Sequence, residues 1–181
     1  MSVTIPQTSY TMRPSIALAG MQGDCDEGQL VIGKFTAAET LLPGRVVELD
    51  PTDSTKCRYP KTASAVGALL GVVMYSAADP VGGTVGTADG GFKAGDTVRI
   101  LRRGQIWCEY TGTAGSDMMT AMKVRSASDD SNSEAQHRGK LTDAGTSTTV
   151  GQEKYATKLL CMEETVSGTG LVLVELNGPL T

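Results

Sequence analysis

The sequence has little of what most enzymes and nucleic-acid-binding proteins depend on. Among its 181 residues there is one histidine and one tryptophan, and aromatic residues make up only 4%. Lysine and arginine number 16 against 20 acidic residues, and the longest basic run is Arg102-Arg103, whereas proteins that bind DNA or RNA usually carry a basic stripe. The formal net charge of −4 therefore argues against nucleic acid as a partner.

Long apolar runs are also missing. No stretch approaches the ~18 apolar residues of a membrane span. Residues 1–20 lack the charged start and the continuous apolar core of a secretory signal. We therefore expect a soluble chain with no membrane partner.

The cysteines are few and widely spaced, at Cys25, Cys57, Cys108 and Cys161. None forms a Cys-x-x-Cys pair or has a histidine close by in sequence, so the spacing does not suit a zinc site. The last three lie in strand-like stretches, where a free cysteine packs as a small hydrophobe. Two disulfides are an alternative, but we expect reduced cysteines and assembly in a cytoplasm.

Groupings typical of catalysis are missing too. His137 lies in the polar stretch 126–138, which offers little packing to hold an imidazole in place. Glu163 and Glu164 are adjacent, and neighbours on a strand point to opposite faces, so they cannot serve one site. No glycine-rich phosphate motif leads into a helix. We expect no enzyme activity, no metal and no cofactor; a hydrolase whose site assembles in space around His137 is the alternative.

What the sequence does contain is a turn-rich β pattern. Hydrophobic residues make up 40%, and the Gly 22 and Pro 7 are scattered, which favours many short strands. LLPGRVVELD (41–50) resembles FKAGDTVRIL (92–101), each a turn glycine followed by a strand, and MTAMKVRSA (119–127) is a weaker third copy without the glycine. Further strands are expected at 56–59, 69–75, 105–110, 156–163 and 170–176, the last two forming a hairpin. The pattern predicts a mainly β fold, a small β-barrel or β-sandwich with long polar loops.

Residues 1–33 differ from the rest and are expected to form an extended N-terminal arm, with the β body spanning 34–181. The arm has no helical or alternating period, yet it carries apolar side chains that need a surface to lie on. A disordered terminus is the alternative. If residues 1–33 form an arm, the side chains expected to contact a partner are those of Met12, Arg13, Pro14, Ile16, Leu18 and Met21.

The stretch GDTVRILRRGQIWCEY (95–110) predicts a hairpin whose turn is Leu101–Gly104, with Gly104 free to take a positive φ. Arg102 and Arg103 then lie at the hairpin tip. Without a second basic cluster or a helix terminus, they suit contacts with an acidic protein surface better than a phosphate site. Trp107 faces away from Ile106 and Cys108, and is either half-buried by a loop or an interface anchor.

Five segments in order, RPSIALAG, PGRVVEL, LLGVVMYS, AGDTVRILRRGQIWCEY and LVLVELNGP, resemble the structural cement, or decoration, proteins of tailed-bacteriophage heads. The sequence departs from that family in its polar insert, residues 126–138. The resemblance implies a small β-protein that assembles as an oligomer on the lattice of the major capsid protein, strengthens the shell and catalyses nothing.

Together with these patterns, the resemblance implies a structural virion protein that binds the outside of a phage capsid, assembled in the host bacterial cytoplasm. Its expected partners are the major capsid protein and itself. A homotrimer is favoured because local three-fold junctions of a capsid match a three-fold partner, and a dimer is the alternative. Two other functions stay open: another structural virion component, such as a head-completion or baseplate protein, and a β module that binds carbohydrate or a small ligand.

Overall fold

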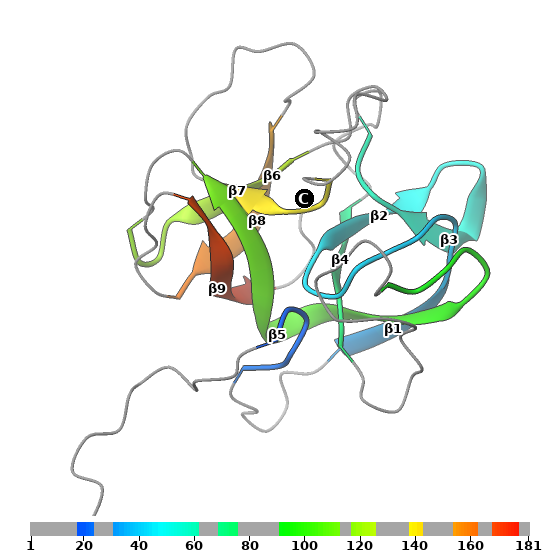
Figure 1. Cartoon of the computed structure of the whole chain (residues 1–181), viewed down its shortest axis with the longest axis horizontal. Helices are drawn as coiled ribbons and strands as arrows, with labels where there is room; N and C mark the ends of the chain where they lie inside the picture. The colour runs from blue at the N-terminus through cyan, green and yellow to red at the C-terminus, as the bar shows by residue number, and fades with distance from the viewer. Residues whose placement is uncertain are drawn as a thin grey trace, which may run out of the picture.

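The structure of the chain is a computed structural model that describes residues 18–23, 31–61, 69–75, 91–112, 117–125, 138–142, 154–162 and 168–177. All regular secondary structure in these ranges is β, which confirms the expected fold class. The nine strands, shown in Figure 1, are β1 (Val31–Ala37), β2 (Val46–Asp50), β3 (Asp53–Arg58), β4 (Leu69–Val73), β5 (Thr97–Gly112), β6 (Ala121–Arg125), β7 (Leu141–Thr142), β8 (Lys154–Cys161) and β9 (Gly168–Asn177).

The strands form two closed rings that share one strand. The sheet order β1-β3-β2-β4-β5 closes because β1 also pairs with β5, and this ring is the first barrel. The order β5-β7-β6-β8-β9 closes in the same way through the pairing of β5 with β9, and this ring is the second barrel. In Figure 1 the green β5 runs through both, with β1–β4 on the right and β6–β9 on the left. The predicted small barrel is therefore present, and a second ring that the sequence pattern did not predict is joined to it.

The predicted hairpin at Leu101–Gly104 is wrong, because β5 is one continuous strand of 16 residues. Leu101 pairs with Ile32 and Arg103 pairs with Val31, so Arg102 is an extra residue on β5 and forms a β-bulge. Gly104 follows with φ 120, a conformation that suits glycine. The features that indicated a turn instead mark the point where β5 passes from the first barrel to the second.

The bulge changes the core that the even-numbered side chains of β5 enter. Before it, Val98 and Ile100 belong to the buried cluster of the first barrel. Beyond it, Ile106 and Cys108 belong to the cluster of the second barrel. Without the extra residue, even-numbered side chains would stay on one side throughout, since successive strand residues alternate between faces.

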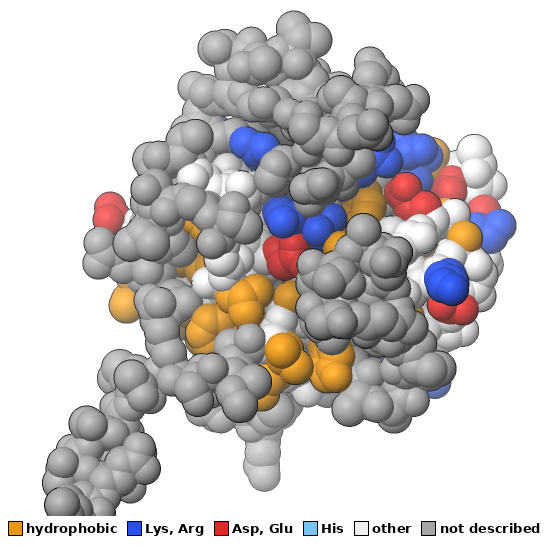
Figure 2. Space-filling view, in the orientation of Figure 1, with side chains coloured by type: hydrophobic (Ala, Val, Ile, Leu, Met, Phe, Trp, Pro, Cys, Tyr) orange, Lys and Arg blue, Asp and Glu red, His pale blue; other side chains and the backbone are white. Residues whose placement is uncertain are grey.

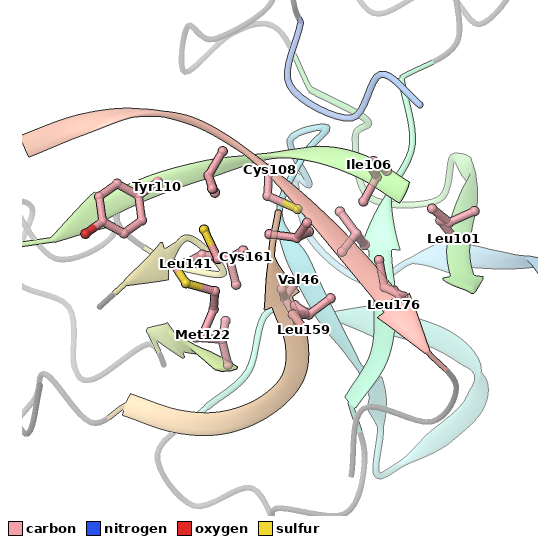
Figure 3. Packing of buried hydrophobic residues seen from close by; sticks show 14 of the residues in the cluster. Val46, Leu101, Ile106, Cys108, Tyr110, Met122, Leu141, Leu159, Cys161 and Leu176 are labelled. Atoms are coloured by element: carbon pink, nitrogen blue, oxygen red, sulfur yellow. The ribbon is translucent and has the colours of Figure 1, made fainter. Parts of the chain in front are cut away.

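The core consists of two hydrophobic clusters, one inside the first barrel and one in the second barrel that also takes in Val46 of β2 and Val72 of β4. The first is lined by residues such as Leu41, Val47 and Phe92, and the second by residues such as Met122, Leu159 and Leu176. In Figure 3 the labelled side chains of the second cluster point toward one another from several strands. Burying a leucine, isoleucine or valine fully contributes about 1.5–3 kcal/mol each, so each cluster is large enough to hold its ring closed.

The turn-and-strand repeat seen in the sequence is confirmed. Both glycine-containing copies place a turn directly before a strand, with φ 75 at Gly44 and φ 95 at Gly95. The two copies also pair with each other, because the backbone N–H groups of Leu41 and Phe92 each donate to the other's carbonyl oxygen at 2.8 Å. The weaker third copy has a turn at residues 118–119, followed by β6, and there Met119 has φ 64. The predicted C-terminal hairpin is present as the antiparallel pair β8 and β9.

The described parts of residues 1–33 are built into the barrels. The expected boundary after Gly33 falls inside β1, which pairs with β5. Residues 18–23 run along β5: the Gly20 N–H donates to the Trp107 carbonyl at 2.7 Å, and the Trp107 N–H donates to the Met21 carbonyl at 2.8 Å. The segment 18–23 therefore lies along β5 of the same chain, and the expected arm from residue 1 to residue 33 stays a prediction. Residues 1–17, which include Met12, Arg13, Pro14 and Ile16, lie outside the described residues, as do Cys25 and His137.

Candidate interaction surfaces and the joint between the barrels

Three charged side chains meet where the two barrels join. Arg45 lies directly before β2, Glu109 lies in the second half of β5, and Lys140 lies directly before β7. The Glu109 Oε2 atom accepts from Arg45 Nε at 3.1 Å and lies 3.0 Å from Arg45 Nη2 and 3.1 Å from Lys140 Nζ. The three side chains are only 7%, 13% and 13% exposed, so this joint cluster is nearly removed from water.

Further contacts fix the guanidinium of Arg45. Its Nη1 donates to the Arg138 carbonyl oxygen at 3.2 Å, and its Cζ lies 5.7 Å from the centre of the Tyr59 ring, within the range of a cation–π contact. One carboxylate oxygen thus receives two cations, each from a segment that leads into a different barrel. Removing one partner of such a buried pair would leave an uncompensated charge, so this contact between the barrels depends on all three side chains.

The reactive side chains of the described core are buried. Burial raises the pKa of the Cys57 thiol to about 12 and raises that of Cys108 as well, which disfavours the thiolate that reacts as a nucleophile. Cys57, Cys108 and Cys161 form no disulfide and are buried, which confirms that they pack as small hydrophobes. Burial also raises the pKa of Tyr59 to about 12, and its hydroxyl oxygen accepts from the Leu42 N–H at 2.7 Å.

Part of the predicted contact surface is brought together. Leu18 is half-buried and Met21 is 40% exposed, and their segment lies along β5 beside Trp107. Figure 2 shows hydrophobic side chains grouped below the centre of the visible face, in the region where segment 18–23 crosses β5 in Figure 1. Trp107 itself is 7% exposed, so little of its indole is left for a partner to cover. Arg102 and Arg103 are both exposed at the bulge, further along the same strand.

One exposed apolar group was not predicted from the sequence. Met118 is 61% exposed and Met119 is 56% exposed, and together with Met21 they are the exposed large hydrophobic residues of the described ranges. The signal that could have identified them is the third copy of the repeat, in which methionine stands where the other copies have glycine.

Two searches of the described residues complete the survey. Within those ranges, no group of three or more His, Cys, Asp or Glu side chains could hold a metal ion. None of the secondary structure described there is a helix long and apolar enough to cross a membrane.

Two closed rings that share β5, each with a packed core, define a double-barrel β-protein. Residues 5–177 match the family described as structural cement protein (E217 gp24/Pam3 gp6), and the chain belongs to this family. It is a structural phage protein that binds the capsid and reinforces it, as the sequence predicted.

The fold is shared with a chain of a solved phage particle. A chain of "The capsid of Myoviridae Phage XM1" superposes with a TM-score of 0.60 at 19% identity, covering 95% of this chain and 97% of that chain. At this identity the likeness establishes the fold, over nearly the whole length of both proteins. No curated protein matches the sequence.

Proposed function

We propose that this protein attaches to the outer surface of a phage head, where it contacts the major capsid protein and holds neighbouring shell subunits together. The observation that carries the proposal is the family match, which spans residues 5–177 and therefore both barrels. A double barrel with a shared strand and a buried ionic joint is a stiff body, and a stiff body resists the movement of subunits that it bridges.

The contact surface that we propose follows β5. Met12, Arg13, Pro14 and Ile16 would extend it, while Leu18 and Met21 lie on the segment that is hydrogen-bonded to β5. That segment has further support, because the Gly23 N–H donates to the Gln105 carbonyl at 2.9 Å and the Tyr75 N–H donates to the Gly20 carbonyl at 2.8 Å. In this arrangement Trp107 acts mainly by holding the segment in place.

Arg102 and Arg103 form the second part of this surface. The bulge leaves both guanidinium groups exposed on consecutive residues, so together they present two positive charges at one point of β5. Such a pair suits an acidic surface of the capsid protein, where charges at the rim of an interface raise the association rate and fix its orientation.

The protein acts as a homo-oligomer in this proposal, a trimer in preference to a dimer, because a trimer matches the local three-fold positions of a capsid lattice. It is assembled in the host bacterial cytoplasm, and the three cysteines of the described core, which form no disulfide, support this. It needs no cofactor, nucleic acid or membrane and is not an enzyme. In support of this, the described thiols are buried and the Glu109 carboxylate is held by two cations.

The test uses phage heads prepared without this protein, to which the purified full chain is added. We expect saturable binding and a higher temperature of head disruption. The double variant Arg102→Glu/Arg103→Glu should weaken binding by at least about tenfold, mainly through slower association. The matched control Lys34→Glu/Lys93→Glu makes the same change of charge at two exposed lysines elsewhere and should bind like the wild type. Failure of the wild type to bind would contradict the proposed function, and equal loss in both variants would show that only net charge matters.

A further inference from the structure

The turn before β6 presents two large apolar side chains to solvent. The Thr120 N–H donates to the Asp117 carbonyl at 3.2 Å, which closes a four-residue turn with Met118 and Met119 at its centre. Met119 has φ 64, while Met118 is not among the residues with positive φ. This is the arrangement of a type II turn, whose third position favours glycine or asparagine.

Most of the other turns of this kind have glycine at the matching position. The described residues contain five other two-residue turns that lie directly or one residue before a strand or an isolated bridge, and the second residue of four of them is a glycine with positive φ: Gly20 (φ 78), Gly44 (φ 75), Gly95 (φ 95) and Gly139 (φ 73). The fifth turn, before β3, has Thr52 at this position without a positive φ, so it does not need glycine. Met119 occupies this position in the turn before β6. A side chain there strains the backbone, and an apolar side chain that is 56% exposed adds no packing to the core. Folding therefore gives no reason for methionine at residue 119.

The turn is nevertheless held firmly. The Met119 N–H donates to the Cys161 carbonyl at 2.6 Å, and the Cys161 N–H donates to the Thr120 carbonyl at 3.0 Å. Cys161 is fully buried in the core of the second barrel, so the turn is fixed to a rigid support. The backbone of the turn is thus ordered before a partner binds, so binding has to order only the two side chains, which strengthens binding.

We propose that Met118 and Met119 form an anchor that inserts into an apolar recess of the capsid protein. The proposal rests on the proposed function and names a second contact for it. The turn lies at the left margin of Figure 1, on the second barrel, whereas segment 18–23 lies near the bottom centre beside β5. Two separate contacts on one stiff body allow the protein to grip the shell at two points.

The size and chemistry of the anchor favour this partner over a second copy of the chain. Two side chains cover only a small part of the ~1,200 Å² that a stable protein interface buries at minimum, so they cannot hold a dimer alone but can act as an anchor within a larger interface. Methionine is flexible and polarizable, so it adapts to an irregular apolar recess. The exposed carboxylate of Asp117 beside the anchor favours a recess with a basic side chain at its rim.

The experiment compares Met119→Gly, Met118→Ser, the double variant and the conservative control Met118→Leu with the wild type. Each is measured by thermal unfolding, by light scattering for oligomeric state and by binding to heads prepared without the protein. We expect Met119→Gly to melt at or above the wild-type temperature, because glycine suits this turn. The double variant should bind heads at least about tenfold more weakly, and Met118→Leu should bind like the wild type.

The outcomes separate this inference from the proposed function. If the double variant binds heads as tightly as the wild type, the proposed role of Met118 and Met119 is wrong and the proposed function is unaffected. A double variant that no longer self-associates would show that the turn faces a second copy, which also overturns the proposal. A clear fall in the melting temperature of Met119→Gly would show that the methionine serves folding. Wild-type protein that does not bind heads at all would overturn the proposed function and this inference with it.

Discussion

Replacing Glu109 by glutamine should destabilise the fold strongly, because it removes the only negative charge of the joint cluster. Arg45 and Lys140 would then hold positive charges in a site where their side chains are only 7% and 13% exposed. Breaking a buried ion pair by removing one partner costs about 3–5 kcal/mol, which is a large share of the ~5–15 kcal/mol by which domains are typically stable. We expect a loss of this size in the free energy of unfolding.

Equilibrium unfolding in urea measures this directly, with two probes. Fluorescence of Trp107, the single tryptophan, reports on β5 where the barrels meet, and circular dichroism reports on all strands. The matched control is Lys56→Gln, which breaks an ion pair of similar length, 3.1 Å, between side chains that are 45% and 37% exposed, and which should change stability little. A loss below about 1 kcal/mol for Glu109→Gln would refute the view that the cluster is buried and couples the barrels.

Three other outcomes are expected. Deleting residues 1–33 removes the segment 18–23 that is hydrogen-bonded to β5 and part of β1, and should unfold or strongly destabilise the protein in a thermal unfolding experiment. Gly95→Ala should lower the free energy of unfolding by ~1 kcal/mol, because the positive φ disfavours alanine but a Cβ there would have nothing within 4 Å. Gly44→Ala should lower it several times more, because a Cβ at Gly44 would lie 2.7 Å from a neighbouring side-chain carbon. Burial raises the pKa of Tyr59 from its ordinary 10.0 to about 12. The protonated hydroxyl therefore contributes fully to the free energy of unfolding below pH 10, and this contribution is lost as the pH rises through 12. In the variant Tyr59→Phe, the free energy of unfolding should change less with pH in this alkaline range.

Local patterns in the sequence predicted the elements that depend on local chemistry. The turn glycines Gly44 and Gly95 and the alternation that follows them identified two strand starts, and the structure has both. The C-terminal hairpin and the buried state of Cys57, Cys108 and Cys161 were found in the same way. These features are set by residues close in sequence, so one sequence is enough to predict them.

The remaining features depend on pairings between distant residues. A glycine after polar residues fits both a hairpin turn and a bulge, and the pairing of β5 with β1 and β9 is what makes Arg102-Arg103-Gly104 part of one strand. The joint cluster combines Arg45, Glu109 and Lys140 from three separate segments, and no spacing in the sequence indicates that they meet. The partner-binding roles of Arg102, Arg103 and Trp107 stay predictions.

The most direct test of the central claim is an electron cryomicroscopy reconstruction of heads to which the purified protein has been added, compared with the same heads without it. The account predicts additional density on the outer surface that fits the two barrels, with β5 crossing between them and the turn of Met118 and Met119 directed into the shell. Density on the inner surface or only at the tail vertex, or identical reconstructions with and without the protein, would contradict it.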